Sequence, residues 1–333
     1  MNTPNESIRL SNQIKGNNFV ILGRGGMDIY PDPPGTRTED AARFFACLGG
    51  SSANIGVAIT RQGGKATLVT SVSDDAVGRF VLNELAKYGI DARHVKSVRG
   101  EFRTSLAVVE SRVDDHQSVI YRNGAADFEM TVQDVEAVDF ARHGALIATG
   151  TIFAAEPSRG AAFRAFELAK SAGLPIIFDI DYRPYSWPSS DVAAQIYTRA
   201  ATLCDIVIGN DDEFGIMAGG KDMGVEMARQ LAATTASIVV YKMGENGAIT
   251  FADGTEIRTG IYPVTALKPT GAGDAFMGGF IVALANGKAT KECVLRGSAA
   301  AAIVVSKVGC APAMPTTQQL DGFLTTHPGP TEN

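Results

Sequence analysis

The sequence predicts an α/β fold in which helices cover a central, mostly parallel sheet, with a small second sheet beside it. Short apolar runs of strand length alternate with segments of helix length, and strands separated by helices pair in parallel through right-handed crossovers. Two glycine-rich turns lead directly into helices, and one interval holds only short strand-like runs. The expected strands of the main sheet are 18–22, 66–72, 145–149, 175–179, 205–209 and 238–241.

The chain is long enough for one large domain, because 333 residues with a hydrophobic fraction of 45% are ample for a core. No internal repeat, low-complexity linker or shift in composition marks a boundary inside it. We therefore expect a single domain over 18–325, with frayed tails at 1–17 and 326–333.

Charge and cysteine content exclude several classes of partner. The net charge is −6 with both signs mixed along the chain, so we expect no nucleic-acid partner. The apolar runs fall short of the ~20 residues that cross a bilayer, and the polar start has no signal-peptide pattern. These features predict a cytoplasmic protein without a membrane segment. The four cysteines are too far apart in sequence for a metal motif, and we expect buried thiols.

The first strand, 18–22, opens into Gly-Arg-Gly-Gly-Met-Asp at 23–28. A dinucleotide-binding turn would need a third glycine where Asp28 stands, so a dehydrogenase is disfavoured. Gly49 and Gly50 then precede two serines that can cap a helix, which we expect to run to about Arg61.

The next segments predict one more helix and the second sheet. Strand 66–72 is followed by a helix to about Tyr88 whose first turn is acidic, as the helix dipole prefers. Residues 104–110 and 118–121 are short strand-like runs around a polar turn. With the non-helical stretch 35–47 they predict a small sheet built from about 35–47 and 102–123, which we call the lid.

The second half of the chain continues the alternation. A cluster of acidic, basic and aromatic residues at 179–187 follows a strand, at the end where open parallel sheets bind ligands. The remaining expected elements are a helix at 159–172, a hairpin of 248–251 with 256–260, helices from Gly273 and over 289–306, and a surface helix past Gln318.

The turn Gly271-Ala272-Gly273-Asp274 precedes an apolar helix and is the clearest chemical motif. The glycines free the backbone, and the unpaired N–H groups of a helix N-terminus bind anions. A carboxylate in that positive field stays ionised and can take a proton from a hydroxyl. The turn predicts phosphoryl transfer to an alcohol, although Asp274 could also serve only as a first-turn acid.

These residues resemble the Gly-Ala-Gly-Asp signature of the ribokinase-like (PfkB) carbohydrate kinases. The resemblance covers roughly 19–315 and implies a three-layer, Rossmann-like ribokinase fold with a β lid over the sugar. It implies that Asp274 is the catalytic base and that the amides of Gly271, Ala272 and Gly273 neutralise the phosphoryl charge. It also assigns Asp28, Gly49, Gly50 and Asn54 to sugar binding.

The resemblance further indicates an acidic sugar. Related sugar-acid kinases place a Tyr-Arg pair like Tyr121 and Arg122 against the substrate, and Arg183 belongs to a string that is usually Asp-x-Asn-x-Arg. Asp181 departs from that pattern, and the resemblance implies that Asp181 and Arg183 both bind the substrate. The string looks like the branch that phosphorylates 5-dehydro-2-deoxygluconate at its C6 hydroxyl in inositol catabolism, with 2-dehydro-3-deoxygluconate, then fructose or ribose, as alternatives.

ATP and Mg²⁺ are the cofactors that the resemblance implies. It carries Glu213 over as a Mg²⁺ ligand through water, in keeping with the coordination that Mg²⁺ prefers. The positions that it places along the nucleotide are Asn210, Lys242, Gly244, Gly247 and Gly309. Many relatives hold a monovalent cation with an Asp where this chain has Lys268, so we expect the ammonium group to replace that ion.

A protein that only binds its ligand and a protein with another phosphate or metal motif are the alternatives to a ribokinase-like enzyme. A catalytically silent sugar or nucleotide sensor would be marked by loss of the aspartate or glycines of the 271–274 turn, and both are intact. No Gly-Lys-Ser/Thr phosphate loop and no zinc motif occur in the sequence. Some relatives pair through their lids, so a homodimer is a further expectation.

Overall fold

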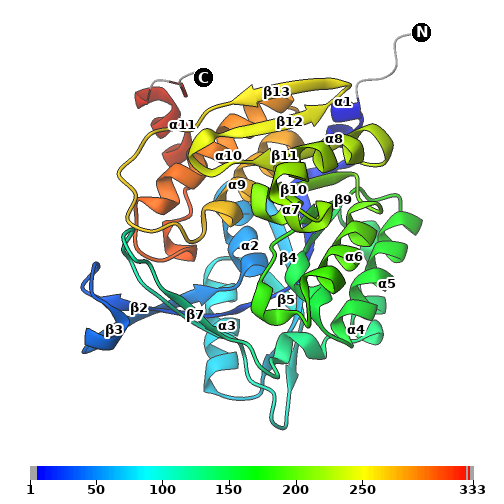
Figure 1. Cartoon of the computed structure of the whole chain (residues 1–333). Coiled ribbons are helices and arrows are strands. Elements are labelled where there is room, and N and C mark those ends of the chain that lie inside the picture. The colour runs from blue at the N-terminus through cyan, green and yellow to red at the C-terminus, as the bar shows by residue number, and fades with distance from the viewer. Residues whose placement is uncertain (1–5, 328, 331–333) are drawn as a thin grey trace.

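The computed structural model describes residues 6–327, 329 and 330, and its centre is a nine-stranded sheet (Figure 1). The strand order is β13-β12-β11-β10-β9-β8-β1-β4-β5. All neighbouring pairs from β11 to β5 are parallel, and β12 and β13 add an antiparallel edge. The strands are β1 (Asn18–Leu22), β4 (Lys65–Ser73), β5 (Asp91–Val98), β8 (Ala145–Thr149), β9 (Ile176–Asp179), β10 (Ile206–Asn210), β11 (Ile238–Lys242), β12 (Ala248–Ala252) and β13 (Thr255–Thr259). This confirms the predicted α/β fold.

Helices cover both faces of the sheet, because successive side chains of each strand point to opposite sides. In β1, Phe19 and Ile21 join one core cluster, and Val20 and Leu22 join the other. The first cluster includes residues of α1 (Glu6–Gln13), α2 (Ser51–Arg61), α3 (Ala76–Lys87), α9 (Ala272–Ala285), α10 (Thr290–Val305) and α11 (Thr317–Thr326). The second includes residues of α4 (Val132–Glu136), α5 (Ser158–Ser171), α6 (Ser190–Ala201), α7 (Asp211–Ala218) and α8 (Gly224–Thr234).

The lid is a separate four-stranded sheet of order β3-β2-β6-β7, which extends away from the helical layers in Figure 1. Its strands are β2 (Gly26–Asp32), β3 (Arg43–Gly49), β6 (Leu106–Val109) and β7 (Ser118–Tyr121). The sequence did not indicate β2, whose Pro31 argues against a strand. Because pairing of β2 with β6 ends at Ile29, the missing N–H of Pro31 falls where only β3 is a neighbour.

The predicted frayed tail at 1–17 is wrong for the part that the structure describes. Helix α1 buries Leu10 completely, and Ser7 hydrogen-bonds through its N–H and Oγ to the Asp253 carboxylate at 3.1 and 2.7 Å. Ser11 Oγ donates to the Leu284 carbonyl at 2.7 Å. The helix therefore docks on the β12–β13 turn and on α9, through polar contacts that a sequence pattern does not reveal.

At the other end of the chain, α11 continues to Thr326, one residue into the predicted second tail, and residues 328 and 331–333 lie outside the described part. All four cysteines are buried free thiols, as expected. Within the described residues, none of the helices has the length and apolar character needed to cross a bilayer.

Candidate active site

Two helix N-termini meet where the predicted sugar and phosphate motifs lie. Gly50 precedes α2 and Gly271 precedes α9, both with positive φ, of 92° and 83°. From the first turns of these helices, Asn54 Nδ2 donates to Asp274 Oδ2 at 2.9 Å. The structure thus brings together two residues that are 220 positions apart in the sequence.

The turn before α9 is open to an anion. Among the described residues, the N–H groups of Ala272 and Gly273 have no hydrogen-bond acceptor. A Cβ at Gly273 would meet only Lys242 Nζ, at 3.6 Å, so this lysine lies over the turn. Two free amides and an ammonium group at a helix N-terminus form an anion-binding site.

Asp274 has the protonation behaviour of a general base near neutral pH. Burial and the carboxylate of Asp181 raise its pKa to about 6, against the opposing effects of the Asn54 hydrogen bond, Arg183 and Arg24. Above that pH the group is ionised and can accept a proton, and its basicity exceeds that of an ordinary aspartate.

Asp28 enters the cleft from the lid strand β2. It packs directly over Gly49, where a Cβ would lie 1.9 Å from Asp28 Oδ1, so only glycine fits. Tyr30 OH donates to Asp28 Oδ2 at 3.5 Å. Asp28 Oδ1 and Asn54 Oδ1 are buried acceptors without a partner in the described part of the chain, and two such acceptors suit the hydroxyl groups of a sugar.

The 179–187 string lies beside Asp274. Asp181 adopts a positive φ of 39° and forms an ion pair with Arg183 Nη2 at 2.6 Å. Although burial alone would raise it, the pKa of Asp181 is lowered, chiefly by Arg183. Burial raises the pKa of Asp179 well above its ordinary value, with Lys242 opposing.

The predicted Tyr121-Arg122 pair divides between two environments. Tyr121 is 63% exposed on the face of the lid that points away from the cleft, so it does not line the cleft in this structure and its role in sugar binding stays a prediction. Strand alternation is the reason, because Ile120 and not Tyr121 packs on the cleft side. Arg122 does point inward, but it forms an ion pair with Asp127, donates to Thr151 O at 3.0 Å and stacks on Phe128.

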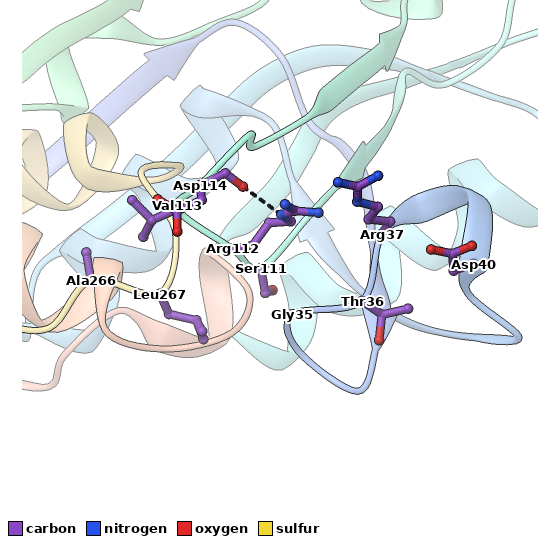
Figure 2. Close-up of a pocket in the computed structure, with 10 residues that line it drawn as sticks. All are labelled: Gly35, Thr36, Arg37, Asp40, Ser111, Arg112, Val113, Asp114, Ala266 and Leu267. Atoms are coloured by element: carbon purple, nitrogen blue, oxygen red, sulfur yellow. Dashed lines mark hydrogen bonds between the residues drawn. The ribbon is translucent and has the colours of Figure 1, made fainter.

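Two cavities flank this region. One of about 330 Å³ is lined by Arg122, Phe128 and Tyr185, among others, and so joins the lid edge to the 179–187 string. Figure 2 shows another, of about 630 Å³, between lid loops and residues 266–267, where Arg37 and Arg112 are matched by Asp40 and Asp114. None of the predicted site residues lines the second cavity, and its charges balance, so it does not belong to the site.

Asn210 and Lys242 lie side by side at the carboxyl ends of β10 and β11. Asn210 and Glu213 form a capping box, in which Glu213 Oε2 accepts from Asn210 N at 2.7 Å. Glu213 Oε1 accepts from Tyr182 N at 3.2 Å. Burial raises the pKa of Glu213, and Lys242 opposes that effect.

The described residues contain no cluster of three His, Cys, Asp or Glu side chains that could hold a metal. A Mg²⁺ ion bound mainly by phosphate oxygens and water needs no such cage. Glu213 fits that arrangement only as a partner through water, because both of its oxygens already accept backbone N–H groups.

The predicted nucleotide glycines differ in their surroundings. Gly244 has a φ of 57° and open space where a Cβ would stand. At Gly247 a Cβ would lie 2.0 Å from Thr259 O, so this glycine is required by the approach of β13. Gly309 packs against Pro312 and Cys47.

Lys268 is fully buried beneath the anion turn. Its Nζ donates to Thr270 O at 2.6 Å and to Val304 O at 3.4 Å, and it lies 3.8 Å from Cys310 Sγ. Backbone carbonyls are the ligands that hold a buried cation, and here the cation belongs to a side chain.

Arg24 is a site residue that the sequence analysis did not single out. It is only 7% exposed, and Nη1 donates to Ser105 Oγ at 3.3 Å. Its charge acts on Asp28, Asp181 and Asp274. The sequence signal that could have identified Arg24 is its position between Gly23 and Gly25, directly after the first strand.

The fold and the site together define an α/β protein in which a glycine-rich turn at a helix N-terminus and a buried aspartate lie beside a small second sheet. A profile of the pfkB family carbohydrate kinases matches residues 18–317. The 5-dehydro-2-deoxygluconokinase of Photobacterium profundum is 39% identical over 92% of this chain and 94% of its own length. That of Geobacillus kaustophilus is 35% identical over 95% and 96%.

A crystal structure of fructokinase from Vibrio cholerae O395 with fructose, ADP and calcium superposes with a TM-score of 0.81 at 24% identity, over 93% of this chain and all of that one. This likeness concerns the fold. The chain belongs to the pfkB family of carbohydrate kinases, as its motifs predict.

Proposed function

We propose that this protein phosphorylates 5-dehydro-2-deoxy-D-gluconate on its C6 hydroxyl with ATP as the donor. The observation that carries the proposal is the Asn54–Asp274 hydrogen bond beside the free amides of Ala272 and Gly273. Relatives with that enzyme name, at 33–39% identity over nearly the whole chain, support the choice of sugar acid.

In the proposed mechanism Asp28 and Asn54 hold the sugar through their unpaired oxygens, and Asp274 receives the proton of the C6 hydroxyl. The hydroxyl oxygen forms a bond to the γ-phosphorus as the bond from that phosphorus to the β-phosphate oxygen breaks, and ADP leaves. The amides of the 271–273 turn and Lys242 stabilise the charge on the transferred group.

ATP lies, on this proposal, along Asn210, Lys242, Gly244, Gly247 and Gly309, and Mg²⁺ accompanies its phosphates. When bound, Mg²⁺ would supply positive charge beside the phosphate oxygens, and Glu213 would hold it through water. Lys268 takes the place of a monovalent cation, which its shell of carbonyl oxygens supports. Arg183 neutralises Asp181, so the cleft does not repel an anionic sugar.

A homodimer through the lid is part of the proposal. The side of the lid away from the cleft, its outer face, has two cross-strand rows of apolar residues, Ala46-Ile29-Val108-Val119 and Met27-Leu106-Tyr121. The second row continues to Leu48, which is already buried in the main core. Val119 is 47% exposed and Tyr121 63%. Two such faces, brought together, would remove this apolar surface from water.

The test is a coupled assay of ADP release with a panel of acceptors: 5-dehydro-2-deoxygluconate, 2-dehydro-3-deoxygluconate, fructose and ribose. We expect the first to have the highest kcat/KM, and phosphorus NMR of the product should show a C6 phosphate. A higher kcat/KM for any other acceptor would replace the proposed substrate. The absence of turnover with all four, despite ATP binding, would favour the sensor.

A further inference from the structure

The proposed substrate carries a carboxylate at C1, at the opposite end from the C6 hydroxyl that reacts. The following inference rests on that proposed function. A carboxylate in a buried cleft needs a cationic partner with free donors, because an unpaired buried charge is strongly unfavourable. The partner must lie away from Asp274, on the side of the sugar that the lid covers.

The two arginines that the family resemblance suggests are already neutralised by this chain. Arg122 and Asp127 form a buried ion pair with side chains only 3% and 2% exposed. Arg183 holds Asp181 at 2.6 Å. Either could touch a second carboxylate, but neither brings an uncompensated charge to it.

Arg24 differs from both. No carboxylate of the described residues forms an ion pair with it, although the side chain is more than nine-tenths buried. Its one hydrogen bond within that part of the chain is the 3.3 Å contact from Nη1 to Ser105 Oγ, so a fork of guanidinium donors remains available.

The backbone of Arg24 is held firmly in place. Ala53 N, in the first turn of α2, donates to Arg24 O at 3.2 Å, and a Cβ at Gly50 would lie only 2.4 Å from that oxygen. The side chain reaches from this turn to Ser105 at the root of β6. It therefore spans the joint between the main sheet and the lid.

The guanidinium group of Arg24 lies at the lid end of the cleft, because Nη1 contacts Ser105 Oγ directly before β6, the strand that pairs with β2 at Asp28. There the positive charge of Arg24 opposes the rise that burial causes in the pKa of Asp28.

We propose that Arg24 binds the substrate carboxylate and selects acids over neutral sugars. The planar guanidinium matches a carboxylate with two parallel hydrogen bonds. A neutral ketose offers the guanidinium no carboxylate to hydrogen-bond, so Arg24 favours the acid over the neutral sugar, beyond its longer-range attraction to Asp28, Asp181 and Asp274.

The experiment measures steady-state kinetics of Arg24→Met with 5-dehydro-2-deoxygluconate and ATP, alongside Arg199→Met as a matched control. Arg199 stacks on Phe163 at 4.0 Å, in the α5–α6 layer. For Arg24→Met we expect KM for the acid to rise about 100-fold, with kcat and the KM for ATP within about threefold of wild type. Fructose should bind the variant at least as well as the wild type. Arg199→Met should leave kcat, the KM for the acid, the KM for ATP and fructose binding near their wild-type values.

Several results would overturn the inference. Equal losses for acid and fructose, or a fall in kcat with a normal KM, would assign Arg24 to positioning the lid. A rise in KM for the acid in Arg122→Met but not in Arg24→Met would move the carboxylate to Arg122.

If Arg24→Met does not fold, Arg24→Lys decides. We expect its KM for the acid to rise about tenfold, and an unchanged KM refutes the inference. A wild-type enzyme that prefers neutral sugars refutes the proposed function itself, whereas the other outcomes leave it standing.

Discussion

The two glycine-rich turns of this molecule share a backbone geometry and differ in the groups that lie beside them. Gly50 and Gly271 each precede a helix with a positive φ, and a side chain at either would collide with a neighbour. At the first turn the neighbour is Arg24 O, which also accepts the N–H of Ala53. At the second turn it is Cys310 Sγ, and the amides of Ala272 and Gly273 are left free of the described chain.

This difference separates a structural turn from an anion-binding one. Both turns expose helix N-termini to the same cleft, and both satisfy the sequence pattern of glycines before a helix. The N–H groups of Ser51 and Ser52 at the first turn also have no backbone acceptor among the described residues, so the ammonium group of Lys242 beside the second turn is what distinguishes it. We therefore expect substitutions at the first turn to affect folding and sugar binding, and those at the second to affect phosphoryl transfer.

The largest expected effect is that of Asp274→Asn, which removes the base and keeps the shape. We expect kcat to fall about 10³-fold, since general-base catalysis contributes roughly 10²–10⁴. Asp212→Asn, at an exposed first-turn acid of α7, should keep wild-type kcat. Turnover of Asp274→Asn at the wild-type rate would remove the base from the mechanism.

The same residue predicts the pH profile. Because only the ionised carboxylate accepts a proton and burial with Asp181 raises its pKa to about 6, kcat/KM should rise with pH, reach half its maximum near pH 6 and level off above. Asp274→Asn should lose this step in its residual activity. A wild-type profile that is flat between pH 5 and 8 contradicts the assignment.

Alanine at each turn tests the comparison directly. Gly273→Ala adds a methyl group with no protein atom closer than 3.6 Å, so we expect an unchanged Tm and a loss of about 10- to 100-fold in kcat/KM for ATP. Gly50→Ala meets Arg24 O at 2.4 Å, with a φ of 92°, and should lower Tm by several degrees. Differential scanning calorimetry and ATP kinetics on both variants measure this, and a reversed pattern would refute the division of roles.

Lys268 supports the second turn from below, through its hydrogen bond to Thr270 O. Lys268→Met removes the donor to Thr270 O and Val304 O, and we expect kcat to fall about tenfold. The wild-type kcat should be the same in potassium chloride and in choline chloride. Added potassium should partly restore the kcat of Lys268→Met. Strong potassium activation of the wild type, kept unchanged in Lys268→Met, would show that the ammonium does not replace an ion.

The smallest catalytic effect is expected on the outer face of the lid. Val119→Lys places a charge in the exposed apolar row, and light scattering should show the proposed dimer converted to monomer. The kcat should remain within about threefold, because Val119 faces away from Asp28. Ser118→Lys, on the opposite face of the same strand, is the matched control for added charge, and equal dissociation by both would argue against this interface.

The main sheet was largely predictable because its strands are apolar on both faces and follow helices of clear period. Strands β1 and β8 have the predicted bounds. Strand β5 escaped prediction, since as an edge strand it is mostly polar and half-exposed. Strand β2 was not predicted because Gly26 and Pro31 obscure its alternation of inward-facing and outward-facing residues.

The candidate site was predictable where one short motif fixes its own geometry, as in 271–274. The placement of a side chain was not predictable where it depends on a partner far away in the sequence. Tyr121 and Arg122 are adjacent, yet the pleat of β7 sends one to solvent and the other to Asp127. Arg24 shows the reverse, because nothing in its neighbours along the chain reveals that it lacks a carboxylate partner.

The docking of helix α1 has a consequence for how the chain matures. Ser7 hydrogen-bonds to a residue 246 positions later, and Ser11 to one 273 positions later. On the ribosome this helix therefore emerges long before the surfaces that hold it, and it stays undocked until nearly all of the polypeptide has been synthesised. Docking of α1 is therefore among the last events in the folding of each newly synthesised chain. Protection of the α1 amides from hydrogen exchange would report that folding is complete.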